Sequence, residues 1–138
     1  MKNPKRVMVD MSATIIHHGH IRLLREASLY GSVVVALTTD SEVQKAKGYR
    51  PELNFAERKE ILESIRYVDS VVPSPWLIND DFLDKNGIDF LLHGHDNSNP
   101  VSSERMIILN RTEGISSSII RERVFQTIAE KKFSKKKL

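Results

Sequence analysis

Short runs of apolar, mostly β-branched residues alternate along this chain with longer segments in which apolar residues recur every three or four positions. A short apolar run between turn-forming residues is typical of a buried strand, and the three-to-four-residue spacing is typical of a helix packed on one side. These patterns predict strands at 6–11, 32–39, 69–74, 88–94 and 105–109. They predict helices at 19–30, 55–66, 79–87 and 117–131, and a loop at 40–53.

The alternation of strands and helices indicates the fold class. Strands that are apolar almost throughout belong to parallel sheets covered on both faces. We therefore expect an α/β fold, a Rossmann-like parallel five-stranded sheet with helices on both faces, in a single domain. Such sheets bind ligands beyond the carboxyl ends of their strands, where the strand order reverses. Functional side chains should therefore follow the strands.

Length, charge and composition restrict the possibilities further. The 138 residues are enough for one domain, expected at 1–130, followed by a basic and disordered tail at 131–138. That tail holds five lysines, so the other 130 residues carry 16 basic and 18 acidic side chains and do not resemble a nucleic-acid-binding surface. The chain has no cysteine, no signal-peptide core and no apolar segment long enough to insert into a membrane, which suits a cytoplasmic protein.

All five histidines follow predicted strands. His17, His18 and His20 come after the first strand, and His93 and His95 end the fourth, beside Asp96. Gly19, inside the first group, allows a tight turn or a close approach to a ligand. His20 would lie in the first turn of a helix, whose free N–H groups and dipole attract anions.

A second candidate site is the segment RTEGISSSIIRERV at residues 111–124. It places a basic residue, a glycine and three serines ahead of a helix, and a hydroxyl-rich helix start with free backbone N–H groups can hold a phosphate. Two such helix starts, each after a strand, suggest a polyphosphate bound across the edge of the sheet.

Three interpretations of the histidines compete. They can merely end a strand and cap a helix. They can ligate a metal ion with His93, His95 and Asp96, although no carboxylate is evidently placed to orient each imidazole. They can also stabilise charge on a phosphorus centre during group transfer. The serine-rich segment favours the third interpretation.

The HxGH element at residues 17–20, the string RTEGIS at 111–116 and the segment AERKEILESIRYVDSVV at 56–72 resemble the cytidylyltransferase family of nucleotidyltransferases. The likeness spans about residues 6–124 and is strongest to the bacterial glycerol-3-phosphate cytidylyltransferase branch. It implies transfer of CMP from CTP to a small phosphorylated acceptor with release of pyrophosphate, by direct attack on the α-phosphorus. It also implies Mg²⁺ bound mainly through the triphosphate, no metal site built from protein ligands, and a homodimer with IRYVD, residues 65–69, in the subunit contact.

The resemblance also implies roles for individual residues. His17, His20, Lys45 and Arg111 match catalytic positions, with Arg111 holding the β- and γ-phosphates. Thr14, Lys45, Lys47 and Arg58 match positions near the acceptor. The implied nucleotide site comprises Met11, Ser12, Ala13, Gly19, His20, His95, Asp96, Arg111, Glu113, Gly114, Ile115, Ser116, Ser117 and Ser118.

The chain departs from the family in its first loop, which usually contains G-T-F-D. Here Met11 stands at the glycine position, Ser12 at the threonine and Thr14 at the acid. This suggests a shifted triphosphate site and a remodelled acceptor pocket. The acceptor therefore stays open among polyol phosphates, phosphocholine, phosphoethanolamine, sugar phosphates and phosphorylated amino acids, with a role in surface polysaccharide as one possibility.

Three other functions also stay open at this stage. The helix start ISSSIIRER would equally suit an adenylyltransferase that uses ATP. The histidines would suit a metal-dependent hydrolase. The altered first loop would suit a nucleotide-binding module without catalysis. Trp76, the only tryptophan, is expected to be a packing residue.

Overall fold

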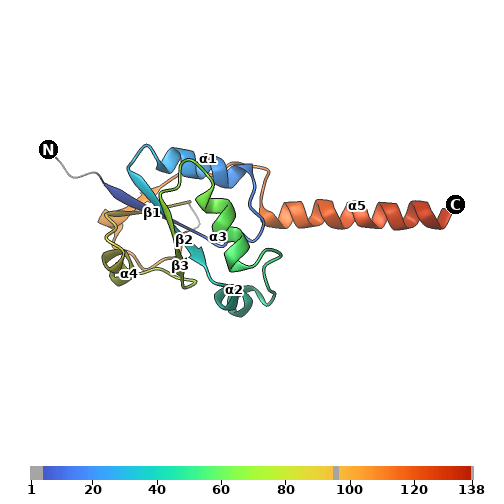
Figure 1. The fold of residues 1–138 in the computed structure, drawn as a ribbon, viewed down its shortest axis with the longest axis horizontal. Coiled ribbons are helices and arrows are strands. Elements are labelled where there is room, and N and C mark those ends of the chain that lie inside the picture. Colours follow the sequence, from blue (N-terminus) through green and yellow to red (C-terminus); the bar gives the residue numbers. More distant parts are fainter. Residues whose placement is uncertain (1–4, 95–96, 138) are drawn as a thin grey trace.

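The computed structural model describes residues 5–94 and 97–137, and it shows a parallel five-stranded sheet with the strand order β3-β2-β1-β4-β5 (Figure 1). The strands are β1 (Arg6–Met11), β2 (Ser32–Thr38), β3 (Ser70–Ser74), β4 (Phe90–His93) and β5 (Met106–Ile108). The helices are α1 (His18–Ala27), α2 (Asp40–Lys47), α3 (Phe55–Glu63), α4 (Asp80–Lys85) and α5 (Ser117–Lys137), with a 3-10 turn at Ser103–Arg105. The predicted fold class is confirmed.

Two apolar cores lie on opposite faces of the sheet, because successive strand residues point to opposite sides. Val7 and Val9 of β1 belong to the core that contains Leu24 of α1 and Leu62 of α3. Met8, between the two valines, belongs to the other core, with α4. Helices therefore cover both faces, as the apolar strands predicted.

The strand order reverses between β1 and β4. β1 pairs with β2 on one side and with β4 on the other, with Val9 opposite Leu92. Because all five strands are parallel, the residues that follow β1 and β4 meet at one edge of the sheet. The tertiary structure thus brings His93 to the same cavity as His17 and His20, which are more than seventy residues away in the chain.

The predicted loop at 40–53 was wrong in its first half, which forms α2. Thr39 caps this helix by accepting a hydrogen bond from the Glu42 backbone N–H, and Gly48 ends it with φ of 79°. A hydroxyl residue three positions before a glutamate and a terminal glycine are the usual signals of a helix. The apolar pattern missed it because Val43 is its only buried residue.

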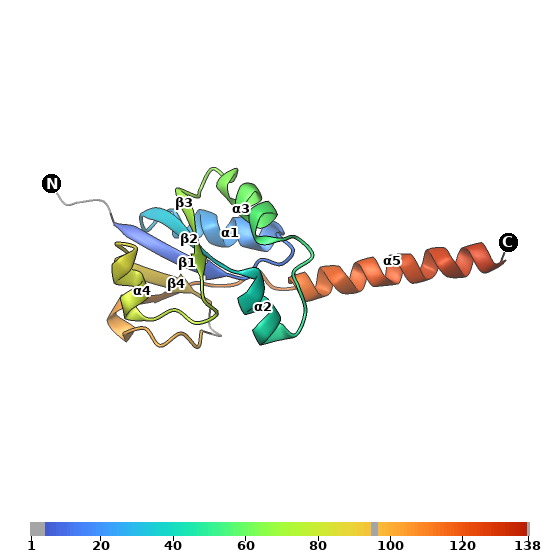
Figure 2. The same cartoon turned by 60° about the horizontal axis from the view of Figure 1, so that its bottom comes forward.

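Helix α5 is longer than predicted. It continues to Lys137, so the expected disordered tail at 131–138 is helical as far as that residue. Beyond its first turns the helix extends away from the sheet (Figure 2). Val124, Phe125 and Ile128 are about half exposed or more. Within the part of the chain that is described, no helix is long and apolar enough to cross a membrane.

Candidate functional site

A cavity of about 390 Å³ opens at the carboxyl ends of β1 and β4. Its lining includes both halves of the predicted site. One half comes from the loop after β1 and the start of α1, and the other from the segment before α5. The predicted residues in the lining are Met11, Ser12, Ala13, His17, Gly19, His20, Lys47, Arg111, Ile115, Ser116, Ser117 and Ser118.

The two motif histidines build the start of α1 through their rings. His17 has extended backbone angles and caps the helix, and its Nδ1 accepts a hydrogen bond of 3.1 Å from the Gly19 backbone N–H. The Nδ1 of His20 accepts a 3.1 Å hydrogen bond from the His17 backbone N–H. The two ring centroids lie 3.9 Å apart. His18 is exposed and does not line the cavity.

These hydrogen bonds determine where the proton of each neutral imidazole lies. A ring nitrogen that accepts a hydrogen bond carries no proton, so the proton of each ring is on Nε2. Burial lowers the pKa of His20 to about 3, with His17 and Arg111 adding to the effect. Burial also lowers the pKa of His17, with His18 adding to it. Both rings are therefore neutral near pH 7, with Nε2–H as a hydrogen-bond donor.

The pKa of His20 gives a prediction that needs no substrate. Its imidazole signals in a two-dimensional ¹H–¹⁵N spectrum should show the Nε2–H form unchanged from about pH 8 to about pH 5. The unfolded chain protonates this ring near 6.5 and the folded chain only near 3, so stability should fall as the pH drops through this window. A His20 ring that titrates near 6.5 would contradict the structure.

Gly19 lines the cavity, so its predicted close approach to a ligand stays a prediction, and the structure gives a further reason for a glycine here. A Cβ at this position would lie 2.9 Å from Cε1 of His17 and 3.1 Å from Cγ2 of Ile115. Both distances are shorter than ordinary contacts between carbon atoms. Glycine therefore leaves space for the His17 ring between α1 and the segment before α5.

The serine-rich segment forms the second part of the cavity lining, against the loop after β1 and the start of α1. Ser116 caps α5, since its Oγ accepts a hydrogen bond from the Ile119 backbone N–H at 3.1 Å. Ser117 Oγ donates to the Ile15 carbonyl at 3.0 Å and accepts from the Ile15 N–H at 3.3 Å, so it joins α5 to the loop after β1. Ser118 lines the cavity and is exposed. Glu113 and Gly114, also predicted to bind nucleotide, are exposed and do not line it.

The structure rearranges the predicted acceptor side. Lys47 lines the cavity with its Nζ 5.8 Å from the centre of the Trp76 ring, whereas Lys45 is exposed and lies outside the lining. Thr14 is 1% exposed, and its hydroxyl accepts a hydrogen bond from Arg121. Arg58 is 0% exposed and outside the lining. Both side chains are enclosed by protein here, so the geometry gives no support to the predicted contact of the acceptor with Thr14 and Arg58, which stays a prediction.

Sequence reasoning missed a polar network in the floor of the cavity. Asp10 Oδ1 lies 2.5 Å from His93 Nδ1, and Asp10 Oδ2 accepts a hydrogen bond from Asn99 at 3.0 Å. Oδ1 of Asn99 in turn accepts a hydrogen bond of 2.8 Å from the Ile78 backbone N–H. A carboxylate does therefore orient one of the histidines. A polar residue at the end of an otherwise apolar strand was the available signal, but the pairing depends on β1 lying beside β4.

Trp76 lines the cavity and is 38% exposed, which corrects the expectation of a packing residue. His95 and Asp96 lie outside the described residues, so their predicted contacts with nucleotide or metal are not described. Within the described ranges, no group of three or more histidines and carboxylates could hold a metal ion.

Comparison with known proteins decides the family. Residues 12–123 match the model of the family described as cytidylyltransferase-like. The chain belongs to the cytidylyltransferase-like family. Over 127 residues it is 37% identical to the glycerol-3-phosphate cytidylyltransferase of Staphylococcus aureus (strain NCTC 8325 / PS 47). The matched segment covers 88% of this chain and 96% of that protein. The predicted resemblance is confirmed.

Other relatives of this cytidylyltransferase-like chain carry different names. It is 33% identical to the ethanolamine-phosphate cytidylyltransferase of Dictyostelium discoideum over 85% of this chain, but it spans only 36% of that protein. A solved structure, the lipopolysaccharide core biosynthesis protein from Thermoplasma volcanium GSS1, shares the fold with a TM-score of 0.67 over 80% of this chain, at 19% identity. The relatives named cytidylyltransferases are nucleotidyltransferases, and this member of their family is an enzyme of that class.

Proposed function

We propose that the chain transfers CMP from CTP to a small phosphorylated alcohol and releases pyrophosphate. One observation carries this proposal. Two neutral imidazoles with donating Nε2–H groups, His17 and His20, line the same cavity as the serine-rich start of α5. Hydrogen-bond donors from two separate segments of the chain in one cavity suit an extended triphosphate better than a single phosphate.

The reaction asks mainly for alignment and charge stabilisation. An oxygen of the acceptor phosphate attacks the α-phosphorus of CTP, and the bond from that phosphorus to the oxygen bridging to the β-phosphorus breaks. The electron pair of that bond leaves with pyrophosphate. Negative charge accumulates on the oxygens around the α-phosphorus, where His17 and His20 donate hydrogen bonds without losing a proton.

Arg111 and the serine-rich start of α5 hold the leaving group in this proposal. Arg111 lines the cavity, and its positive charge would stabilise the negative charge on the leaving pyrophosphate. The free backbone N–H groups at the start of α5, beside Ser116, Ser117 and Ser118, add further donors and the positive end of the helix dipole. Lys47, beside Trp76, is the lysine of the lining that would meet the acceptor phosphate.

The proposed cofactor is Mg²⁺. Because the described residues contain no trio of metal ligands, the phosphates of CTP would have to supply most of its ligands. The ion would neutralise phosphate charge, while the residues named above orient the nucleotide. A homodimer is also proposed, with residues 65–69 in its contact, and Tyr67 and Val68 there are only partly buried by the core of their own chain.

A pyrophosphate-release screen tests the proposed function. The purified chain is mixed with Mg²⁺, CTP or ATP, and one acceptor at a time from glycerol 3-phosphate, phosphoethanolamine, phosphocholine, a sugar phosphate and a phosphorylated amino acid. We expect one acceptor to release pyrophosphate with CTP at least about tenfold faster than with ATP. A preference for ATP would indicate an adenylyltransferase, and nucleotide binding without turnover of any acceptor would indicate a binding module. Tightly held zinc or iron in the purified chain would favour a hydrolase.

A further inference from the structure

Arg58 connects three segments of the chain from a fully buried position. Its Nε donates to the Leu53 carbonyl at 3.0 Å, Nη1 to the Ser12 carbonyl at 2.6 Å and Nη2 to Asp40 Oδ1 at 2.7 Å. The side chain is 0% exposed. A buried charge is tolerated only when it is paired and hydrogen-bonded, and here all three nitrogens have partners. Arg58 therefore acts within the protein rather than on a substrate.

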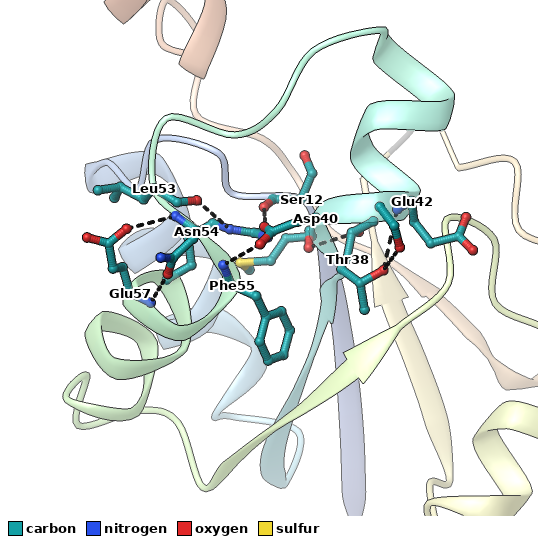
Figure 3. A network of polar contacts seen from close by, with 12 residues as sticks. Ser12, Thr38, Asp40, Glu42, Leu53, Asn54, Phe55 and Glu57 are labelled. Carbon is teal, nitrogen blue, oxygen red and sulfur yellow. Dashed lines mark hydrogen bonds and ion pairs between the residues drawn. The ribbon is translucent and has the colours of Figure 1, made fainter.

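Asp40 anchors the guanidinium. Its Oδ1 pairs with Arg58, and its Oδ2 accepts the backbone N–H of Phe55 at 3.1 Å. Asp40 is the first residue of α2 and Phe55 the first residue of α3, so the carboxylate joins the two helix starts. Figure 3 shows Ser12, Asp40 and Leu53 converging from these separate segments. We call Arg58 with Asp40 the buried clamp.

The clamp grips the peptide next to an unusual backbone angle. Ala13 has φ of 43°, and it is the only residue other than glycine with a positive φ in the described part of the chain. Side chains other than that of glycine disfavour this left-handed conformation, so the surrounding structure must hold it. The peptide that rotates with φ of Ala13 contains the Ser12 carbonyl, which Arg58 holds at 2.6 Å.

The strained loop belongs to the cavity. Met11, Ser12 and Ala13 line it beside His17, whereas Arg58 does not. A second contact supports the loop on its other side, because Thr38 Oγ1 donates to the Met11 carbonyl at 3.3 Å. The orientation of these peptides decides which backbone atoms face a bound phosphate.

We propose that Arg58 and Asp40 are positioning residues that hold the Ser12–Ala13 peptide in its strained orientation, so that the loop after β1 meets the triphosphate preformed. The proposal rests on the proposed function for the identity of the ligand, and on geometry alone for the loop. Without the clamp, the left-handed angle at Ala13 loses its support and the loop relaxes. The apparent affinity for nucleotide then falls in proportion to the fraction of molecules whose loop has the binding-competent conformation.

A double-mutant cycle tests the clamp. Arg58→Lys keeps the charge but cannot reach three acceptors at once, and Ala13→Gly removes the cost of the left-handed angle. We expect Arg58→Lys to raise KM for CTP about tenfold with a smaller change in kcat. In the Ala13→Gly background, the same substitution should raise KM for CTP at most about threefold. Lys59→Gln, an exposed change on the same helix, is the matched control. Equal costs in both backgrounds, or a lower melting temperature with unchanged KM, would overturn the proposal.

A structural measurement separates this proposal from the proposed function. The coupling constant between the amide and α protons of Ala13, together with amide exchange of residues 12–14, reports the loop without nucleotide. Arg58→Lys should change both, and Asp40→Asn, which keeps an acceptor for Phe55, should change them in the same direction by less. If the loop changes while the wild-type chain turns over no acceptor, the clamp stands and the proposed function fails. If the wild-type chain turns over CTP and the loop does not change, the clamp fails.

Discussion

His20→Ala is expected to lower kcat about 100- to 1000-fold, because it removes a preorganised donor to the oxygens around the α-phosphorus. This corresponds to about 3–4 kcal/mol of transition-state stabilisation. KM for CTP should change much less, since the charge that His20 meets is largest in the transition state. Initial rates of pyrophosphate release at saturating CTP and acceptor measure the effect, and His17→Ala should behave in the same way.

Two further variants make the His20 experiment specific. His18→Ala alters the exposed neighbour that lies outside the cavity lining, and it should leave kcat within about twofold. His20→Asn retains a side-chain acceptor for the His17 N–H, so it separates loss of the helix cap from loss of the Nε2 donor. Near-normal turnover by His20→Ala, with the fold intact by circular dichroism, would refute the assigned role.

Arg111→Ala is expected to lower kcat/KM for CTP about 100-fold, because a charge-assisted contact to the leaving phosphates is lost. Arg111→Lys should recover part of the loss, since a lysine supplies the charge without the planar pair of donors. Substrate saturation curves for CTP at a fixed acceptor concentration provide the measurement. Arg123→Ala, on the exposed side of α5, is the matched control. If Arg111→Ala changed only the KM of the acceptor, Arg111 would belong to the other end of the cavity.

Much of this architecture is readable from local patterns. The apolar runs located all five strands, and the signal is strongest in the central strand β2, because a strand buried on both faces excludes polar residues along its length. The helix predicted at 55–66 is α3, and reciprocal capping bonds of 2.9 Å between Asn54 and Glu57 fix its start. The apolar pattern did not predict the polar helix α2, because a helix with one buried side chain shows almost no apolar periodicity.

The candidate site divides in the same way. His17, Gly19, His20, Arg111 and the serines at 116–118 line one cavity because each follows a strand, and parallel strands end at a common edge. The pattern therefore predicted which residues would line the cavity together. It did not predict which hydrogen bonds their polar atoms would form, since the residue type alone does not determine whether a side chain is buried.

Burial and hydrogen-bond partners explain where the structure gives no support to the residue-level expectations. Arg58 and Thr14 have the chemistry of acceptor ligands, yet Asp40, Ser12 and Arg121 occupy their polar atoms. Asp10 and His93 pair only because β4 lies beside β1, a neighbour relation between strands about eighty residues apart. Local patterns were sufficient for every strand and every helix except α2, and the sequence motifs were sufficient for the resemblance to the family. Long-range packing was needed to separate side chains that face the ligand from those that hold the loop, because desolvation and pairing depend on the whole fold.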